Sequence, residues 1–417
     1  MTRNNAYHVA RKTPGTGVKD YESQIDMAAL RRYRLRRLRQ QLIEKDYAAC
    51  VLFDPVNIRY ATGTRNMQVF TQRCPDRYVF VPSDGPVVLF DSYRANHQID
   101  VSETVDERRP ASTWYFEVKG STERVLDSAK KWADEIADLV TQHGGGNRRL
   151  AIDRLWPVCF PPLIGRGIQL FDGQEVAERA RSIKSAEEIA CMTAAISVCE
   201  AGMARMHENA CAGMSENELW ALLVYSNAKH GGEWMDTRLL ASGGRTNPWY
   251  QECGEKLIRV GDLVVYDTDL VGPLGYCADI SRTFHVGPGK PSAEQKRLYR
   301  HAYEQIHTNI DLIKPGVSYR EFMEKSWPIP EEFLGNRYGC MVHGVGLVDE
   351  YPDIPHALDW DDYGYDGVFE EHMTLCVESY VGAEGGSEGV KLEEQILLTA
   401  DGVQILSTFP YESNLLD

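Results

Sequence analysis

The sequence predicts a mixed α/β (α+β) chain of two folded domains behind a short N-terminal arm, residues 1–25. First, helical and extended apolar segments alternate over residues 26–182, a pattern typical of an α/β domain. Second, the long amphipathic segment "RARSIKSAEEIACMTAAISVCEAGMARM" indicates a helix that opens another domain, residues 183–417. Third, the valine-rich alternation of "DLVVYDTDLV" predicts a strand inside that second domain.

Local patterns predict the elements of the first domain. "DMAALRRYRLRRLRQQLIEKDY" spaces its leucines as a helix does, and "SAKKWADEIADLVTQHGGG" predicts a helix that its glycines end. "AACVLFDP", "RRLAID" and "RYVFVPSDGPVVLF" predict strands, the last with a Ser-Asp-Gly-Pro turn at its middle.

Two further helices of the second domain start at recognisable caps. Ser215 and Glu218 form a capping-box pair before "ELWALLVYSNAKHGG", which a glycine stop ends. Ser292 and Gln295 begin "AEQKRLYRHAYEQIHTNIDLIKPG" in the same way. The strands between these helices carry the chemically informative residues.

Composition limits the functional classes. Lys plus Arg is 45 and Asp plus Glu is 61, so the net charge of −16 argues against nucleic acid or an anionic membrane as partner. The arginines of residues 31–39 are therefore expected to form a solvated helix face. We expect no membrane span, no secretory signal, reduced cysteines and a cytoplasmic protein.

Three aspartates interrupt an apolar stretch, "VVYDTDLVGPLGYCADISRTF". Asp267 and Asp269 have i, i+2 spacing and should share one face of a strand. Asp279 should lie across a hairpin that the Gly-Pro-Leu-Gly turn closes. Three buried carboxylates on one face repel one another strongly, and one or two divalent cations would resolve that conflict.

Further candidate ligands follow downstream. His343 lies between glycines with Asp349 six residues later, and Glu378 and Glu393 lie within predicted strands. A single histidine or glutamate of this kind more often has a structural role than a metal-binding one. Together with the aspartates they form a set rich in oxygen with one imidazole, which suits Mn or Fe and accommodates Zn.

The order Asp, Asp, His, Glu, Glu on strands resembles the pita-bread fold of the creatinase, prolidase and methionine aminopeptidase superfamily. "VLFDPVNIRYATG" and "RARSIKSAEEI" are similar to its creatinase-type N-terminal domain and to the start of its catalytic domain. The resemblance implies a creatinase-like α/β domain followed by a pita-bread domain with a dinuclear metal site. The implied ligands are Asp267, Asp279, His343, Glu378 and Glu393.

The sequence departs from the peptidases of that superfamily at their proton-handling histidines. Their upstream substrate-facing histidine is missing from "LLASGGRTNPWYQECG". Asp349 stands, one residue early, where they keep a second histidine, and Asp269 is an additional carboxylate.

The motifs "EWMDTRLLASGGRTNPWYQECG", "YDTDLVG", "YGCMVHGVGL" and "KLEEQILLT" closely resemble a non-peptidase branch, the dimethylsulfoniopropionate lyases of the DddP type. The resemblance implies two metal ions, expected to be iron as in that branch, with Asp269 as a sixth ligand. It also implies that Asp349 is the base and that Tyr338 lies beside the substrate. The implied reaction is β-elimination of this zwitterion to dimethyl sulfide and acrylate.

Aromatic faces attract a cationic sulfonium, so Trp249, Tyr250 and Tyr338 are candidates for holding it, and Arg245 for pairing with the carboxylate. For each aromatic residue a simple packing role is at least as common, and for Arg245 a surface role is equally common. Two alternatives remain open: a hydrolase of the same fold acting on an Xaa-Pro dipeptide, ectoine or a creatine-like substrate, and a binding protein without catalysis. The resemblance also implies a homodimer.

Overall fold

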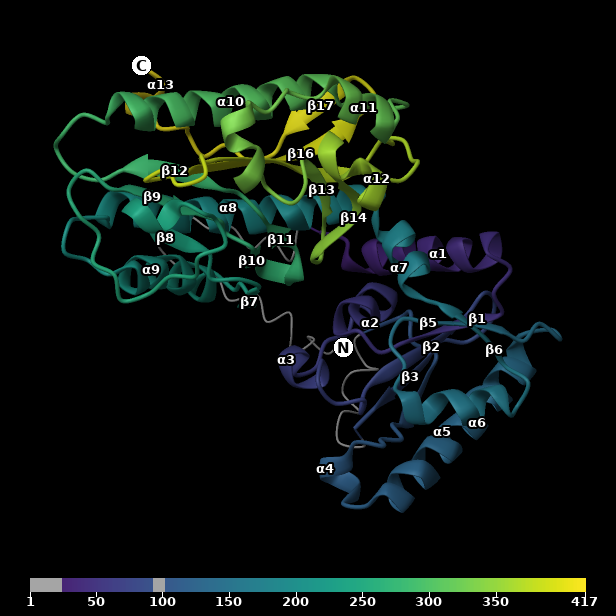
Figure 1. Cartoon of the computed structure of the whole chain (residues 1–417). Helices are drawn as coiled ribbons and strands as arrows, with labels where there is room; N and C mark the ends of the chain where they lie inside the picture. Colours follow the sequence, from purple (N-terminus) through teal and green to yellow (C-terminus); the bar gives the residue numbers. More distant parts are fainter. Residues whose placement is uncertain (1–24, 93–101) are drawn as a thin grey trace. The chain divides into compact units, whose positions relative to one another are not determined.

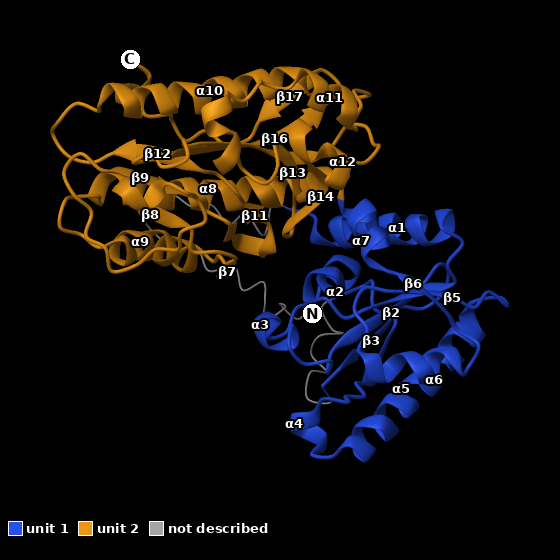
Figure 2. Cartoon of the chain, in the orientation of Figure 1, with its two compact units in different colours: residues 1–181 blue, residues 182–417 orange. Residues whose placement is uncertain are grey.

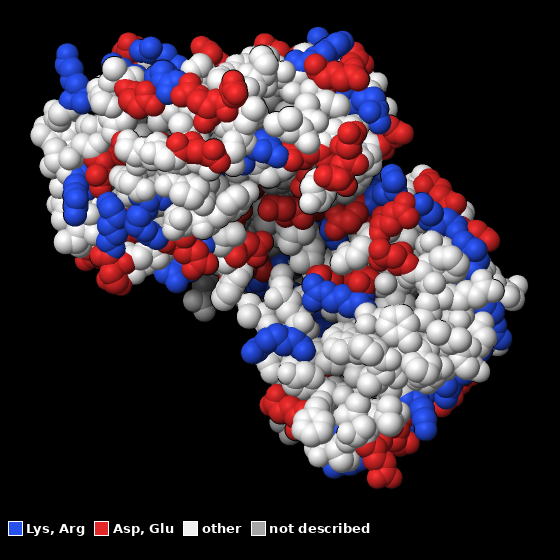
Figure 3. Space-filling model, in the orientation of Figure 1, with Lys and Arg blue, Asp and Glu red and all other residues white. Residues whose placement is uncertain are grey.

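The computed structural model describes residues 25–92 and 102–417 and divides the chain into two compact units, residues 1–181 and 182–417 (Figure 2). The division falls one residue before the predicted boundary after residue 182. Apart from Ile25, the predicted N-terminal arm lies outside the described residues. Figure 3 shows basic and acidic side chains intermixed over the visible face of each unit.

Unit 1 is built on a six-stranded sheet in the order β4-β3-β2-β1-β5-β6. β1 pairs antiparallel with β2 and parallel with β5, and Figure 1 shows α5 and α6 on one face of the sheet and α1 and α7 on the other. The elements are α1 (Met27–Glu44), β1 (Ala49–Leu52), α2 (Pro55–Thr62), α3 (Gln68–Thr71), β2 (Tyr78–Pro82), β3 (Val88–Asp91), β4 (Glu107–Pro110), α4 (Phe116–Lys119), α5 (Thr122–His143), β5 (Arg149–Ile152), η3 (Pro157–Cys159), α6 (Phe160–Ile164), β6 (Gln169–Asp172) and α7 (Gln174–Arg181).

Helix α1 begins at Asp26, whose side chain accepts hydrogen bonds from two backbone N–H groups of the first turn. The prediction that its arginines form a solvated face is wrong for Arg34. That side chain is buried, with its guanidinium 5.6 Å from the ring centre of Tyr60. The long aliphatic stem of arginine allows such burial while the charged group contacts an aromatic ring.

Unit 2 combines one five-stranded sheet, β14-β13-β15-β16-β17, with two three-stranded sheets, β12-β9-β8 and β11-β10-β7. Figure 1 shows α10 and α8 on opposite sides of β12 and β16. The elements are α8 (Ala186–Asn209), α9 (Glu216–Lys229), β7 (Trp234–Met235), β8 (Leu240–Ser242), η4 (Gly243–Thr246), β9 (Leu263–Tyr266), β10 (Leu270–Val271), η5 (Pro273–Gly275), β11 (Cys277–Ala278), β12 (Arg282–His285), α10 (Ala293–Leu312), α11 (Tyr319–Lys325), η6 (Glu331–Asn336), β13 (Val342–Val345), β14 (Asp349–Ile354), η7 (Ala357–Asp359), α12 (Trp360–Tyr363), β15 (Thr374–Val381), β16 (Val390–Thr399), β17 (Gly402–Ile405) and α13 (Ser413–Leu416).

The predicted continuous strand through "DLVVYDTDLV" is wrong. The chain leaves β9 after Tyr266 and enters β10 at Leu270, which belongs to a different sheet. Between them Asp269 has a φ of 35°, a left-handed conformation that a strand does not contain. The aspartates therefore lie at a crossing between sheets, where their side chains are not confined by strand alternation.

The two predicted capping boxes are confirmed at the starts of α9 and α10. By length and composition α8 could also cross a membrane, which the sequence reasoning did not anticipate. Half of that apolar window, 50%, is buried within the unit, where α8 packs on α9 and β11. Core helices of globular proteins share these properties, so α8 is weak evidence for a membrane span.

Candidate metal centre and active site

Two glutamates face each other at the centre of the five-stranded sheet. Glu378 on β15 is the direct antiparallel partner of Glu393 on β16, and both side chains are buried. Like charges opposed in this way destabilise a sheet, and low polarity strengthens their repulsion. The pairing therefore requires nearby positive charge.

An imidazole from β13 joins the two glutamates. His343 Nε2 lies 2.7 Å from Glu378 Oε1 and 3.5 Å from Glu393 Oε1. The other ring nitrogen, Nδ1, donates a hydrogen bond to the carbonyl oxygen of Gly344 at 2.9 Å. This bond leaves Nε2 as the ring atom that faces the carboxylates, as in metal-binding histidines. Burial lowers the pKa of the imidazole, but the carboxylates of Asp349 and Glu378 outweigh it and raise that pKa well above its ordinary range.

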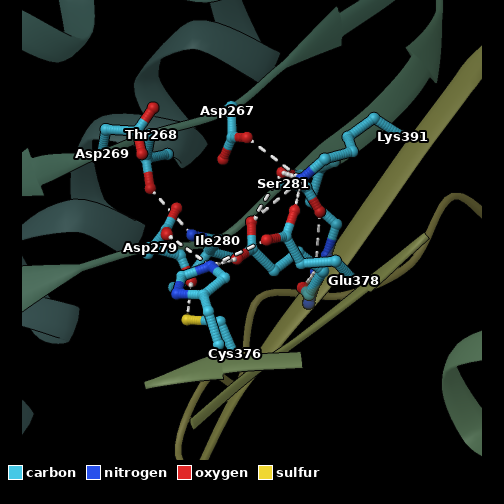
Figure 4. A network of polar contacts seen from close by, with 12 residues as sticks. Asp267, Thr268, Asp269, Asp279, Ile280, Ser281, Cys376, Glu378 and Lys391 are labelled. Atoms are coloured by element: carbon cyan, nitrogen blue, oxygen red, sulfur yellow. Dashed lines mark hydrogen bonds and ion pairs between the residues drawn. The ribbon is translucent and has the colours of Figure 1, made fainter. Parts of the chain in front are cut away.

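The three aspartates come from the two segments that connect the three-stranded sheets. Thr268 ties these segments together, because its hydroxyl donates to Ala278 O at 3.0 Å and accepts from Ile280 N at 2.9 Å. One carboxylate oxygen from each aspartate lies within 4.8 Å of the others, and Figure 4 shows the group around Thr268. The aspartates are Asp267, Asp269 and Asp279.

The donor atoms fit divalent metal. Two further clusters with the same 4.8 Å limit are Asp279, His343, Cys376 and Glu393, and Asp267, Glu378 and Glu393. Buried oxygens Asp267 Oδ1, Asp279 Oδ1 and Glu393 Oε1 accept no hydrogen bond from the described parts of the chain. Buried carboxylate oxygens without donors are costly unless a cation satisfies them. The structure thus brings together all six residues predicted as ligands.

Lys391 is a member of the site that the sequence reasoning missed. Its ammonium is buried and lies 2.5 Å from Glu378 Oε2, 3.0 Å from Asp267 Oδ2 and 2.9 Å from the Ser281 hydroxyl oxygen (Figure 4). Lys391 precedes Glu393 by two residues on β16, so strand alternation places both side chains on one face. This i, i+2 spacing is the sequence signal that could have indicated Lys391. Cys376, a member of one of the clusters, has the same spacing from Glu378 on β15.

The charges of the site shift its pKa values in opposite directions. Burial favours a higher pKa for Asp267, but the Lys391 ammonium outweighs it and lowers that pKa to about 2. Burial, with neighbouring carboxylates, holds the pKa values of Asp269 and Asp279 well above the usual range. Burial likewise raises the pKa of Glu393 to about 7 against the opposing effect of Lys391. One ammonium therefore does not neutralise the whole cluster.

Asp349 is the first residue of β14. Its Oδ1 lies 3.9 Å from His343 Nδ1, and 60% of its side-chain surface is exposed. Partial loss of hydration raises the pKa of the Asp349 carboxyl, and Glu378 adds to the rise while His343 opposes it. An accessible carboxylate beside the ligand cluster is suitably placed to accept a proton from a bound molecule.

Two neighbours of Asp349 were also missed. Burial and the Asp349 charge raise the pKa of Asp236 to about 6, and the Asp236 N–H donates to Asp269 O at 2.9 Å. Glu350 forms a buried ion pair with Lys184. A Cβ on Gly346 would come within 2.5 Å of the Glu350 carboxylate, so a larger residue there would displace that carboxylate.

The residues predicted to contact the substrate differ in how close they lie to the ligand cluster. Tyr338 contacts the site directly, since Lys391 Nζ lies 4.4 Å from its ring centre, and Tyr250 stacks on it with ring centres 5.4 Å apart. Trp249 is buried against Tyr380. Arg245 is engaged by the buried carboxylate of Glu216, so its predicted substrate role gains no support from the structure.

Comparisons with known proteins identify the class to which this site belongs. The sequence profile of metallopeptidase family M24 matches residues 190–400, and that of the creatinase/prolidase N-terminal domain matches residues 34–183. The chain belongs to metallopeptidase family M24, with a creatinase-type N-terminal domain before the unit that carries the candidate metal centre.

Within this family the chain is similar to proteins named dimethylsulfoniopropionate lyase DddP. The protein from Roseovarius nubinhibens is 39% identical over 94% of this chain and 88% of its own length. The protein from Roseobacter denitrificans is 38% identical over the same shares. An Xaa-Pro dipeptidase from Pyrococcus furiosus is 30% identical over 56% of this chain and 65% of its own length.

Solved structures agree on the fold. The Xaa-Pro dipeptidase from Bacillus anthracis matches with a TM-score of 0.74 and 22% identity, covering 92% of this chain and 99% of its own. The prolidase from Pyrococcus horikoshii OT3 matches with a TM-score of 0.70 and 22% identity, covering 91% and 99%. The predicted fold class, a creatinase-like α/β domain followed by a pita-bread domain, is confirmed.

Proposed function

We propose that the chain is a metal-dependent carbon–sulfur lyase that cleaves dimethylsulfoniopropionate into dimethyl sulfide and acrylate. Its relatives at 39% and 38% identity carry that activity in their names. The observation that carries the proposal is the carboxylate of Asp349 beside His343, where the peptidases that the sequence resembles keep an imidazole. A carboxylate base and the ligand cluster suit removal of a proton without any attack by water.

The reaction is a β-elimination. Asp349 takes the proton from the carbon next to the substrate carboxylate, and the electron pair of that C–H bond forms the carbon–carbon double bond. The C–S pair leaves with the sulfur, so that the sulfonium becomes neutral dimethyl sulfide. The raised pKa of Asp349 makes it a stronger base than an ordinary aspartate, provided that it is deprotonated at the working pH.

The metal centre would supply Lewis acidity that stabilises negative charge on the substrate carboxylate. We propose two divalent ions, because oxygen-rich ligation with one imidazole suits iron and manganese better than zinc. The resemblance to the lyase branch favours iron over manganese. Residues Asp267, Asp269, Asp279, His343, Glu378 and Glu393 would hold them. Lys391 orients the carboxylates of Asp267 and Glu378 through its ion pairs with Oδ2 and Oε2.

The direct test is to incubate purified protein of known metal content with dimethylsulfoniopropionate. Gas chromatography of the headspace should detect dimethyl sulfide, and liquid chromatography should detect an equal amount of acrylate. Chelator-treated protein is the matched control and should release little of either product. Metal-loaded protein that produces neither compound would overturn the proposal.

Peptide hydrolysis is the second candidate, favoured by the similarity to Xaa-Pro dipeptidases. It requires donors and acceptors for the protons of an attacking water and a leaving amine. The η4 region and β14 present Arg245 and Asp349 at the segments where resembling peptidases keep histidines. This substitution of residue types makes the lyase the better-supported function.

We further propose that the protein is a cytoplasmic homodimer. Its ligand is a small zwitterionic substrate, and it binds neither nucleic acid nor a membrane. The acidic net charge of −16 supports the lack of polyanionic partners, and the resemblance to creatinase-type proteins supports dimerisation. Light scattering should report about twice the chain mass of 47.1 kDa. A fully active monomer would contradict the dimer.

A further inference from the structure

A cavity of about 610 Å³ adjoins the candidate metal centre within unit 2. Three tyrosines contribute to its lining. The residues that matter for its chemistry are Tyr338, Tyr363, Tyr365, Asp353, Arg337 and Asp359. None of the predicted metal ligands lines it, so it is a neighbouring compartment of the site.

Two residues connect this cavity to the metal centre. Tyr338 lines the cavity, and its ring contacts Lys391, whose ammonium lies against Asp267 and Glu378. Asp353 on β14 is the antiparallel partner of His343 on β13. Directly opposed residues of an antiparallel pair project to the same side of the sheet, so Asp353 emerges on the side of the His343 imidazole.

The lining has one carboxylate that forms no ion pair with the described residues, that of Asp353. Among the lining residues that the structure describes, Arg337 is the only basic one, and its guanidinium forms paired hydrogen bonds with the Asp359 carboxylate. Within residues 25–92 and 102–417, no ion pair or hydrogen bond engages the carboxylate of Asp353, although its backbone N–H donates to the Tyr365 hydroxyl at 2.7 Å. The cavity thus presents a free carboxylate among aromatic rings.

The tyrosines are not equally available to a ligand. The Tyr338 ring already contacts Lys391 and stacks with Tyr250. Tyr365 is stacked on Tyr351 with ring centres 5.8 Å apart. Tyr363, at the end of α12, is exposed, and the described residues include no ring that stacks on it. Its face is therefore free to meet a cation.

We propose that this cavity is the subsite for the methylated onium group of the substrate, with Asp353 supplying the counter-charge and Tyr363 an aromatic face. This inference rests on the proposed function and deepens it. A sulfonium or quaternary ammonium has no N–H or O–H to donate, so it is recognised by aromatic faces and diffuse negative charge instead of directional hydrogen bonds. The carboxylate end of the same molecule would point towards the metal ligands. The site therefore accepts onium carboxylates as a class.

The chemistry gives this subsite a distinctive kinetic signature. The sulfur loses its positive charge as the C–S bond breaks, so a cation-binding group stabilises the bound substrate more than the transition state. Removing that group weakens substrate binding without slowing the chemical step. We expect Asp353→Asn to raise KM roughly 3- to 30-fold, the range of a desolvated cation–aromatic or similar contact, with kcat unchanged or higher.

The experiment uses the full metal-loaded chain and glycine betaine as probe, because its trimethylammonium group is on the α carbon and no β carbon is present, so that β-elimination is impossible. Its Kd is measured by calorimetry, and its inhibition of dimethyl sulfide release is measured in parallel. Asp353→Asn and Tyr363→Ala should each weaken betaine binding roughly 3- to 30-fold. Tyr363→Phe keeps the ring and should bind nearly as tightly as the parent protein.

Asp362→Asn is the matched charge control, because Asp362 is an exposed carboxylate adjacent to Tyr363 in the sequence and does not line the cavity. Unchanged metal content and Tm in all variants exclude a merely structural effect. Betaine binding that is insensitive to both Asp353→Asn and Tyr363→Ala would overturn the subsite, even if the protein releases dimethyl sulfide. Conversely, binding that depends on both residues supports the subsite, even if the lyase activity itself is absent.

Discussion

The Nζ atom of Lys391 lies 3.0 Å from Oδ2 of Asp267, and both side chains are buried. The same ammonium contacts Glu378 and lies 3.4 Å from Glu393 Oε2. One lysine on β16 therefore holds three carboxylates of the candidate metal centre in a common arrangement. Its contribution should be largest when no metal ion shares that task.

Replacing this lysine tests its role as an internal counter-charge. Lys391→Met keeps an unbranched chain but leaves buried carboxylates without their cation, which should cost about 3–5 kcal/mol in the free energy of unfolding of chelator-treated protein. Added metal should recover more stability in the variant than in the parent protein. Denaturant unfolding with and without metal measures both quantities, and equal stability of the two chelated proteins would contradict this role.

Metal uptake should release protons. The pKa of Glu393 is raised to about 7 by burial, so this carboxyl is largely protonated below that pH in metal-free protein. A ligand must lose its proton to bind metal, and metal affinity should therefore fall as pH falls through about 7, by roughly tenfold per pH unit for each proton displaced. Calorimetry in two buffers with different ionisation enthalpies counts the protons. Affinity independent of pH between about 6 and 8 would oppose the assignment.

The buried pair between Lys184 and Glu350 should matter for stability. Lys184→Met leaves the Glu350 carboxylate without this ammonium and should cost about 3–5 kcal/mol in the free energy of unfolding. Because Asp349 is the next residue, we also expect slower turnover in the folded fraction. Lys325→Met removes an exposed lysine from an i, i+4 pair on α11 and is the control, with an expected cost below about 1 kcal/mol. Equal losses in the free energy of unfolding for Lys184→Met and Lys325→Met would show that the buried pair does not contribute specifically to stability.

The chain should hydrolyse peptides poorly. Proton transfer by a positioned side chain typically contributes about 10²- to 10⁴-fold, and the two histidines of the resembling peptidases are replaced here. Gly-Pro and Met-Ala should therefore be cleaved at least about 10²-fold more slowly than by a prolidase assayed beside it. Amino-acid release at the prolidase's rate would show that the residues present suffice for hydrolysis.

Local patterns predicted much of the fold because their physical causes are local. The capping boxes at Ser215 and Ser292 depend on contacts three residues apart, and both form as predicted. The break after Tyr266 could not be predicted in this way, since "VVYDTDLV" alternates as one strand does. The break reflects pairing with separate sheets, which is decided by distant strands such as β7 and β8.

The same distinction applies to the site. The carboxylate and histidine residues were predicted because buried charge of one sign and their order along the chain are visible in the sequence. Lys391 was missed, although its i, i+2 relation to Glu393 was visible, because lysines are mostly exposed. The pairing of Asp353 with His343 depends on the β13–β14 register, which includes a bulge, and no local pattern indicates it.

The central claim is that the Asp349 carboxylate removes the substrate proton, and the most direct test is the turnover of metal-loaded Asp349→Asn protein. Asparagine keeps the size of the side chain and removes its basicity. We predict that dimethyl sulfide release falls about 10²- to 10⁴-fold, while metal content and Tm match those of the parent protein. Release at the parental rate by a folded, fully metal-loaded Asp349→Asn variant would contradict the account.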